Sequence, residues 1–232
     1  MEKLYNGFTL DIPGEAFPLS TDSMALSGFV KLPRNARVLD LGAGAGTLGV
    51  LLCAKDAGCS VVGAERCPVS HAAAEKNILE NGLQQRLKSL HCDIRQLQAH
   101  IAPGSFDCVV TNPPYFSGGP ESLSHGPARR EDNCSLADFV GQAARGLKYG
   151  GDFYIVYRPE RLGELMGCCA AVKLEPKRLC LLRHKVGAPV TLVLLACRKG
   201  GKPGLLWEEV ALQNADGSPT DYYKELYHLE EA

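Results

Sequence analysis

The sequence predicts an α/β fold in which helices flank a mostly parallel sheet. Short apolar segments typical of buried strands alternate along the chain with longer segments typical of helices. A strand expected at 36–41 runs directly into a glycine-rich loop at 42–49 and then into a helix, the arrangement that begins a doubly wound α/β domain. The 232 residues, 45% hydrophobic and 22% charged, suffice for one large globular domain.

The expected elements follow one another with short connections. Within 1–35, apolar pieces are broken by Gly and Pro, and a polar N-cap signal at 20–22 predicts one short helix. Strands are expected at 36–41, 60–65, 87–93, 106–112, 152–158, 177–184 and 190–198. Helices are expected at 46–57, 68–82, 136–147 and 160–172. The last two strands form a hairpin, so one strand should run antiparallel to the sheet. The composition of 116–134 is typical of a loop, and 203–232 matches no clear element.

The charge and cysteine content exclude several classes of protein. The net charge is −1, so binding to a polyanion would need a local basic patch. The ten cysteines are scattered, without a Cys-x-x-Cys pair or zinc-ligand spacing, so we expect no metal site and a reducing compartment. The N-terminal residues lack the pattern of a signal peptide, and no apolar run is long enough to span a membrane. We therefore expect a cytoplasmic protein.

The glycine-rich loop predicts a nucleotide-like ligand. Gly44-x-Gly46-x-x-Gly49 formally matches the dinucleotide fingerprint, which is a weak signal when taken alone. Asp40, however, precedes Gly42, Gly44 and Gly46, and a carboxylate just ahead of the loop would repel a pyrophosphate. It suits a cationic ligand instead. S-adenosyl-L-methionine carries a sulfonium, an ammonium and no phosphate, and is the cofactor that this pattern favours.

Acidic residues also end the next two strands. Glu65 is placed to bind ribose hydroxyls, and Asp93 could accept a hydrogen bond from an adenine amino group. Ligands of such folds bind at the carboxyl edge of the sheet, where these residues and Asp40 would meet. Two simpler explanations remain open, since Asp40 could cap a loop while Glu65 and Asp93 could be solvated strand ends.

The segment Asn112-Pro113-Pro114-Tyr115 follows the fourth strand. Two prolines remove two backbone donors, so the strand must stop there and the chain is stiff. The Asn112 side-chain oxygen and the Pro113 carbonyl could accept both N–H groups of a conjugated amine, freeing its lone pair to attack a sulfonium methyl group. Tyr115, assisted by Phe116, offers an aromatic face to a planar substrate. In isolation the motif would more often be a structural turn.

With these motifs together, the chain resembles the class I S-adenosylmethionine-dependent methyltransferases that act on amino nitrogens. More narrowly, it is similar to the bacterial tRNA1(Val) adenine-N6 methyltransferase family. The resemblance covers about residues 17 to 227 and is carried by the segments FPLSTDSMALSGFV, VLDLGAGAG, NPPY, ARRE, SLADFV and GGDFYIVYRPERL. It implies a Rossmann-like class I methyltransferase fold, with a mostly parallel seven-stranded sheet and an antiparallel strand near the C-terminus.

The resemblance also implies roles for individual residues. The cofactor would be bound by Thr21, Asp22, Asp40, Gly42, Gly44, Gly46, Glu65, Asp93, Ile94 and Asn112. The catalytic residues would be Asn112, Pro113, Pro114 and Tyr115, and the substrate would be bound by Tyr115, Phe116, Arg129 and Arg130. Residues 1–35 would pack over the cofactor site of a methyltransferase domain at 36–200, with 201–232 as its C-terminal extension. The family's Ala-Arg-His-Glu reads Ala-Arg-Arg-Glu here, which leaves the role of Arg130 open.

A basic bias in the second half favours RNA as the substrate. Residues 158–202 contain ten Lys and Arg but only three Glu, as expected for contacts to a phosphate backbone. A solvated basic surface remains an alternative. We expect methylation of an adenine N6 amino group in RNA, with tRNA favoured. Alternatives are a protein glutamine N5-methyltransferase, a catalytically silent RNA-binding module and a nicotinamide oxidoreductase. The first usually has a helical substrate-binding domain before the catalytic one, and 35 preceding residues could not supply it.

Overall fold

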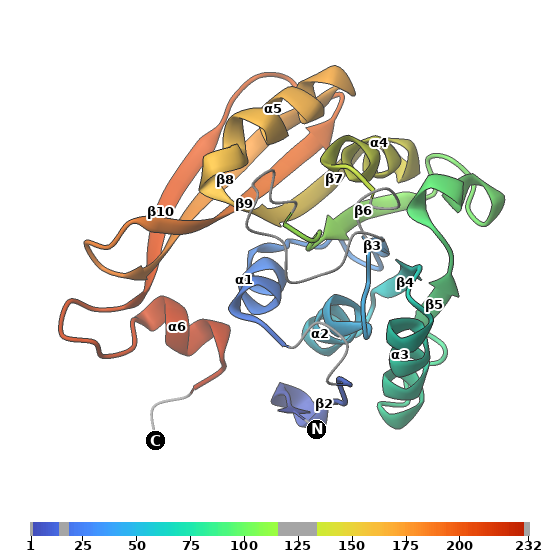
Figure 1. The fold of residues 1–232 in the computed structure, drawn as a ribbon, viewed down its shortest axis with the longest axis horizontal. Coiled ribbons are helices and arrows are strands. Elements are labelled where there is room, and N and C mark those ends of the chain that lie inside the picture. Colours follow the sequence, from blue (N-terminus) through green and yellow to red (C-terminus); the bar gives the residue numbers. More distant parts are fainter. Residues whose placement is uncertain (1, 14–18, 116–133, 230–232) are drawn as a thin grey trace, which may run out of the picture.

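An eight-stranded sheet forms the centre of the protein. The structure is a computed structural model that describes residues 2–13, 19–115 and 134–229. The strands lie in the order β10-β8-β9-β7-β6-β3-β4-β5 (Figure 1). Their bounds are β3 (Arg37–Leu41), β4 (Ser60–Glu65), β5 (Leu87–His91), β6 (Phe106–Thr111), β7 (Leu147–Tyr157), β8 (Leu174–Lys185), β9 (Val190–Lys199) and β10 (Leu206–Gln213). Strand β9 runs antiparallel to β7 and β8, and the other pairs are parallel. The mostly parallel sheet with its late antiparallel strand is confirmed, and β10 adds an eighth strand to the seven predicted.

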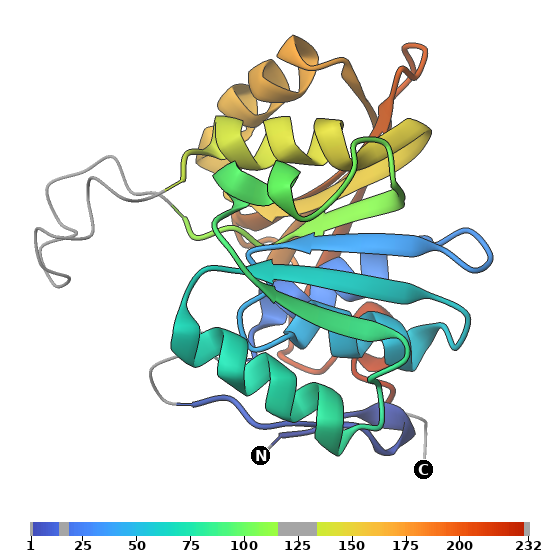
Figure 2. The same cartoon turned by 90° about the vertical axis from the view of Figure 1, so that its right-hand side faces the viewer.

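Helices cover both faces of the sheet (Figure 2). Helices α1, α2, α3 and α6 contribute to the core on one face, while α4, α5 and the short helix η2 pack on the other. Their bounds are α1 (Thr21–Phe29), α2 (Thr47–Lys55), α3 (Pro68–Glu80), α4 (Leu136–Gly146), α5 (Leu162–Ala171), α6 (Asp221–Leu226), η1 (Tyr5–Gly7), η2 (Ile94–Ala99) and η4 (Pro159–Arg161). Two short strands, β1 (Glu2–Lys3) and β2 (Thr9–Leu10), pair with each other outside the main sheet.

Strand β7 starts earlier than the sequence indicates. We expected a helix over 136–147 and a strand only from 152, with Gly150 and Gly151 between them, but α4 ends at Gly146 and β7 begins at Leu147. The register between β6 and β7 shifts here, because Phe106 pairs with Leu147 and Cys108 with Asp152. Gly150 has a φ of +80°, and a Cβ on Gly151 would lie 2.9 Å from the Asp107 carbonyl. The glycines therefore allow a bulge inside a strand rather than ending a helix.

The segment before α1 is fastened to α3 by two asparagines. The Oδ1 of Asn81 accepts from the Thr9 amide at 2.8 Å, and that of Asn77 accepts from the Asp11 amide at 2.8 Å. Asn77 is fully buried, and its Nδ2 donates to the Ala45 carbonyl in the glycine-rich loop at 2.9 Å. Asn77 thus links the N-terminal segment to the loop that follows β3.

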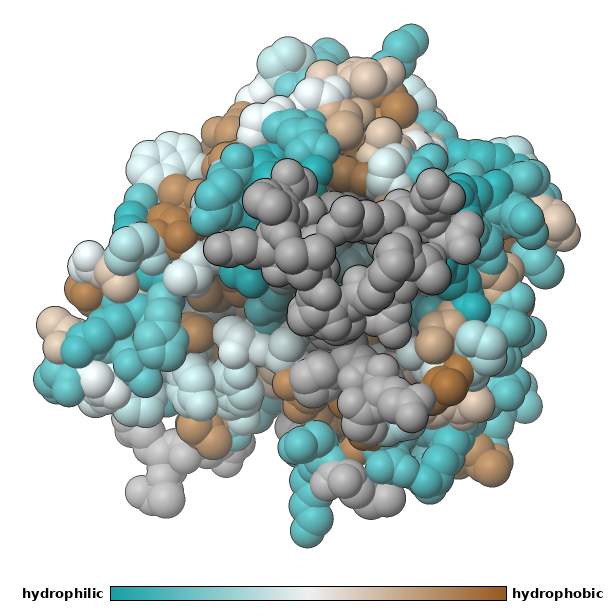
Figure 3. Space-filling model, viewed as in Figure 1, coloured by the Kyte–Doolittle hydropathy of each residue, from teal (hydrophilic) through white to brown (hydrophobic). Residues whose placement is uncertain are grey.

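The described surface is largely polar. On the face shown in Figure 3, hydrophilic residues cover most of the coloured surface and hydrophobic residues occur in small groups. None of the helices within the described ranges has both the length and the apolar character needed to cross a bilayer. Those ranges also contain no group of three or more His, Cys, Asp or Glu side chains placed to hold a metal ion.

Candidate active site

The glycine-rich loop leaves β3 at the carboxyl edge of the sheet. Gly42, Gly44 and Gly46 all have positive φ, at +73°, +56° and +82°, a region that side chains with a Cβ avoid. The amides of Gly42 and Ala43 donate to the Ala64 carbonyl at 2.9 and 3.1 Å, which joins the loop to the end of β4. Apart from its two chain neighbours, no described residue has an atom within 4 Å of the position that a Cβ on Gly44 would take. The backbone at Gly44 is therefore open to a ligand.

Asp40 is a buried carboxylate without a partner. It lies on β3 with a relative exposure of 1%, and neither of its oxygens has a hydrogen-bond partner among the described residues. Burial, together with the nearby charge of Glu65, raises the pKa of Asp40 to about 8. Leaving a carboxylate in this state is costly, and such exceptions call for an explanation in function or a missing partner. A cationic ligand would provide that partner.

Glu65 is held rigidly at the end of β4. One carboxylate oxygen accepts from the Gly44 amide at 2.9 Å, and the other accepts from the Cys67 amide at 2.6 Å. Each oxygen has a second lone pair, so the carboxylate can still accept from two ligand hydroxyls. The sequence placed Glu65 at this strand end, and the structure adds its link to the glycine-rich loop.

Asp93 has a more occupied environment than the sequence indicated. It caps η2, accepting from the Arg95 amide at 2.8 Å, and the Arg95 guanidinium donates to both carboxylate oxygens. These hydrogen bonds lower the pKa of Asp93 to about 2. The Cys134 thiol lies 3.6 Å from the same carboxylate. A ligand amino group would have to share Asp93 with Arg95, while neighbouring Ile94 is buried.

The Asn112-Pro113-Pro114-Tyr115 segment is held by the start of α1. The Nδ2 of Asn112 donates to the Oγ of Ser23 at 3.1 Å, and the Tyr115 hydroxyl donates to the Asp22 carboxylate. At the last residue of β6, the Thr111 hydroxyl donates to the Leu41 carbonyl at 2.7 Å. The segment is thereby fixed both to α1 and to the strand that carries Asp40. Burial, followed by the bond to Asp22, raises the pKa of Tyr115.

A cation and a second aromatic ring pack around Tyr115. The guanidinium carbon of Arg158 lies 4.4 Å from the Tyr115 ring centroid, within the range of a cation–π interaction. Tyr157, the last residue of β7, meets the same ring edge-on at 6.0 Å between centroids. These contacts fix the plane of Tyr115 and place a positive charge beside the segment.

Helix α1 is anchored at both ends. The Ser20 side chain caps its start, accepting from the Ser23 amide at 3.4 Å. At the other end, the Lys55 ammonium donates to the carbonyls of Ser27, Gly28 and Val30 at 2.9, 3.1 and 2.8 Å. A cation at the helix C-terminus satisfies the carbonyls that lack helical partners. The position of Asp22 and Ser23 beside the tetrapeptide therefore does not depend on one contact.

The structure thus brings most of the predicted site residues to one edge of the sheet, in two groups. In the first group, the Gly44 amide binds Glu65, and the charge of Glu65 acts on Asp40. In the second group, Asp22 binds Tyr115 and Ser23 binds Asn112. Phe116, Arg129 and Arg130 lie outside the described residues. Sequence reasoning assigned no role to Ser23, which lies in the segment that carries the family resemblance. It counted Arg158, directly after β7, only among the basic residues of 158–202 and did not indicate its contact with Tyr115.

The basic residues of the second half are less free than their number indicated. Arg178, Arg183 and Arg198 form ion pairs with Glu208, Glu209 and Asp152, respectively. All three carboxylates lie outside the range 158–202 over which the sequence bias was counted. Arg161 pairs with Glu164 inside it. The charge excess of that range is therefore partly neutralised by β10 and β7.

Comparison with known proteins identifies relatives. Residues 22–166 match the family model described as "Methyltransferase small domain". A curated tRNA1(Val) (adenine(37)-N6)-methyltransferase from Flavobacteriaceae bacterium (strain 3519-10) is 25% identical over 152 residues, which are 66% of this chain and 64% of that protein. The chain spans 49% and 50% of the length of the next two relatives.

Two solved structures share the fold. One is described as a predicted O-methyltransferase from Agrobacterium tumefaciens, with a TM-score of 0.75 and 22% identity over 90% of this chain and 96% of that one. The other is the T. thermophilus 16S rRNA N2 G1207 methyltransferase in complex with AdoMet and guanosine. It has a TM-score of 0.55 and 26% identity over 80% of this chain and 45% of that one.

Proposed function

The chain belongs to the methyltransferase small domain family, and from this premise we propose that it transfers a methyl group from S-adenosyl-L-methionine to the N6 amino group of an adenine in RNA, with tRNA as the substrate. The observation that carries the proposal is the Asn112-Pro113-Pro114-Tyr115 segment, held by Ser23 and Asp22 on the edge that also bears Asp40 and Glu65. The tRNA1(Val) adenine methyltransferase among its relatives supports the substrate.

The chain's residues fit the proposed cofactor. The unpartnered Asp40 carboxylate suits a cationic group, and the oxygens of Glu65, fixed by two backbone amides, suit two ribose hydroxyls. The open backbone at Gly44 allows close approach of a ligand. When bound, S-adenosyl-L-methionine supplies a methyl group on a positively charged sulfur. Asp93 and Ile94 are proposed to line its adenine, and residues 1–35 to pack over it.

The tetrapeptide would activate the target amine by binding it. An adenine amino group has two N–H donors and a lone pair delocalised into the ring. We assign its two acceptors to the Asn112 Oδ1 and the Pro113 carbonyl. The Asn112–Ser23 bond engages the nitrogen of the amide rather than its oxygen, which leaves Oδ1 to accept. Holding both N–H groups stabilises the positive charge that develops on the nitrogen and aligns its lone pair.

The aromatic and cationic groups beside the amine fit a flipped base. Tyr115 provides a ring on which a planar base can stack, and such bases must leave their helical stack to be reached. Arg158 already covers the Tyr115 ring. Its guanidinium can stack against a base or bind a flanking phosphate. Phe116, Arg129 and Arg130 remain proposed substrate contacts.

The test is methyl transfer to unmodified tRNA with labelled S-adenosyl-L-methionine, followed by nucleoside analysis. We expect N6-methyladenosine from the parent protein and a loss of about 10²- to 10³-fold with Asn112→Ala, measured at saturating cofactor. Cofactor binding without any methylated adenosine would refute the proposal. Methylation of glutamine in a protein substrate instead would favour the glutamine N5-methyltransferase. RNA retention without methyl transfer would favour a silent RNA-binding module.

A further inference from the structure

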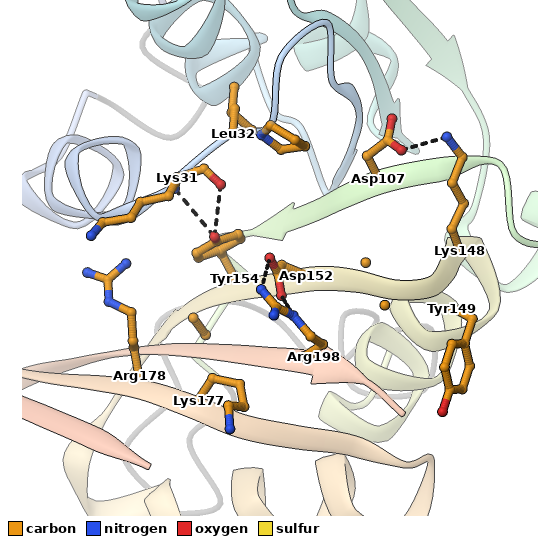
Figure 4. Close-up of a pocket in the computed structure, with 14 residues that line it drawn as sticks. Lys31, Leu32, Asp107, Lys148, Tyr149, Asp152, Tyr154, Lys177, Arg178 and Arg198 are labelled. Atoms are coloured by element: carbon orange, nitrogen blue, oxygen red, sulfur yellow. Dashed lines mark hydrogen bonds and ion pairs between the residues drawn. The ribbon is translucent and has the colours of Figure 1, made fainter. Parts of the chain in front are cut away.

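A polar cavity lies at the amino edge of the sheet, opposite the edge that bears the tetrapeptide. Its volume is about 560 Å³, within the range of ligand pockets. The walls come from the chain after α1, from the starts of β6, β7 and β8, and from the end of the antiparallel strand β9 (Figure 4). We call it the amino-edge pocket. None of the residues predicted from the sequence for the cofactor or the target amine lines it.

The pocket is strongly basic. It is lined by five cations, Lys31, Lys148, Lys177, Arg178 and Arg198, and by two carboxylates, Asp107 and Asp152. The carboxylates are already neutralised, because Asp107 binds Lys148 at 2.5 Å and Asp152 binds Arg198 at 2.8 Å. The other three cations are Lys31, Lys177 and Arg178, of which Arg178 pairs with Glu208 outside the pocket.

Those three cations differ in how firmly they are held. Arg178 lies 4.2 Å from the Phe29 ring centroid and 3.5 Å from Glu208 of β10. The Lys177 ammonium donates to the Lys202 carbonyl at 3.0 Å, a bond that leaves its charge uncompensated. The Lys31 ammonium has no ion pair or hydrogen bond within the described parts of the chain. Lys31 and Lys177 are thus available to an anion.

Hydrogen bonds fix the backbone of one pocket wall, and the positive charges of the pocket lower the pKa of a nearby lysine. The Tyr154 hydroxyl donates to the Lys31 carbonyl at 3.0 Å and accepts from the Lys31 amide at 3.4 Å, which fixes the backbone of this wall (Figure 4). Burial lowers the pKa of Lys55, and the charges of Arg178 and Lys31 lower it further. Lys31 and Lys177 lie on the same pocket without an ion pair among the described residues, and such uncompensated cations attract a phosphate.

We propose that the amino-edge pocket binds backbone phosphates of the RNA substrate at a point away from the methylated base. The inference rests on the proposed function. From Asp107 in the pocket to Asn112 the strand advances five residues, about 17 Å. A stacked strand covers that distance in a handful of nucleotides at about 3.4 Å each. Tyr149, a lining residue with a relative exposure of 82%, adds a stacking surface for a base.

The test compares two double variants that each remove two positive charges. Lys31→Gln with Lys177→Gln empties the pocket of its available cations. Lys3→Gln with Lys88→Gln is the matched control, because both lysines are exposed and lie outside the pocket. The measured quantities are the Kd for unmodified tRNA at several salt concentrations, the Kd for inorganic pyrophosphate and the Kd for S-adenosyl-L-methionine.

We expect the pocket variant to bind tRNA about tenfold more weakly and to reduce the slope of log K against log salt by about 1.5. The control should stay within twofold of the parent, and the cofactor Kd should be the same in all three. Equal tRNA affinity of the two variants would overturn the inference. So would unchanged tRNA binding with loss of inorganic pyrophosphate binding, which would make the pocket a small-anion site. Failure of the parent to methylate RNA would instead count against the proposed function.

Discussion

The side-chain amide of Asn112 donates to the Oγ of Ser23 at 3.1 Å, a bond between residues 89 positions apart. The bond orients the Asn112 side-chain amide, which follows β6. Ser23 lies on α1, which precedes every strand of the main sheet in the sequence. One turn of α1 thereby determines which atom of Asn112 faces a ligand. Because Asp22 on the same turn accepts from Tyr115, the start of α1 holds both ends of the tetrapeptide.

Replacing Ser23 should therefore slow methyl transfer without weakening cofactor binding. In Ser23→Ala the Asn112 amide loses the bond that fixes its orientation, worth about 1 to 1.5 kcal/mol. We expect kcat to fall about tenfold while the Kd for S-adenosyl-L-methionine changes less than twofold. Single-turnover kinetics and isothermal titration measure the two quantities.

Ser27→Ala is the matched control for that variant. Ser27 lies one turn further along α1 and donates only to the Met24 carbonyl of the same helix, at 2.8 Å. Its kcat should equal that of the parent. Equal losses in the two serine variants would mean that α1 acts through its stability rather than through Asn112.

Asp40→Asn should stabilise the ligand-free protein increasingly as the pH rises. The pKa of Asp40 is raised to about 8 in the folded state, far above that of an unfolded aspartate. Below pH 4 Asp40 is protonated in both the folded and the unfolded state, so it does not reduce stability. As the pH rises from there to about 8 the carboxyl group ionises more readily in the unfolded state, and the free energy of unfolding falls. The variant lacks this loss. Its advantage in urea unfolding should grow by at most about 1.4 kcal/mol per pH unit between pH 5 and 8, and level off above; a constant difference would contradict the assigned pKa.

Cofactor affinity should depend on pH through the same carboxyl group. A cationic ligand favours ionised Asp40, so binding below pH 8 must release its proton. We expect the affinity of the parent for S-adenosyl-L-methionine to increase from pH 6 to 8 relative to that of Asp40→Asn. Comparison with this variant removes the titration of the ligand's own amine, which is common to both proteins. Parallel pH profiles in isothermal titration would exclude Asp40 as the ligand's partner.

Gly63→Ala should destabilise the protein and distort the glycine-rich loop. A Cβ at Gly63 of β4 would lie 2.8 Å from the Cβ of Ala43, so the loop would have to shift. We expect a loss of about 1 to 3 kcal/mol in the free energy of unfolding and weaker cofactor binding. In contrast, Gly141→Ala in α4 should gain about 0.5 to 1 kcal/mol, because no described residue beyond its own helix backbone lies within 4 Å of the new Cβ. Urea titration of both variants measures the difference, and a neutral Gly63→Ala would argue against close contact at this position.

The sequence predicted what depends on local pattern. Strands of the parallel sheet are continuous apolar runs, and the turn after β3 needs glycine at Gly42, Gly44 and Gly46 because φ is positive there. Asp40 and Glu65 follow from the same logic, because parallel strands deliver their last residues to one edge. Each of these features can be read within about ten residues of sequence.

Features set by distant contacts could not be predicted in this way. Strand β10 contains Glu208 and Glu209, which interrupt its apolar pattern and bind Arg178 and Arg183 of β8. The pairing of β10 with β8 is thus supported by ion pairs between the two strands rather than by a local sequence pattern. The contact of Arg158 with Tyr115 likewise joins the ends of two different strands. Nothing near either residue in the sequence indicates the other.

The most direct test of the account is nucleoside mass spectrometry of tRNA from cells that lack the gene and carry either the parent protein or Asn112→Ala. If the Asn112 amide holds the adenine amine, one N6-methyladenosine is absent without the gene, returns with the parent and stays absent with Asn112→Ala. Full restoration of that methyl group by Asn112→Ala would contradict the central claim, that the Asn112 amide holds the adenine amine during methyl transfer.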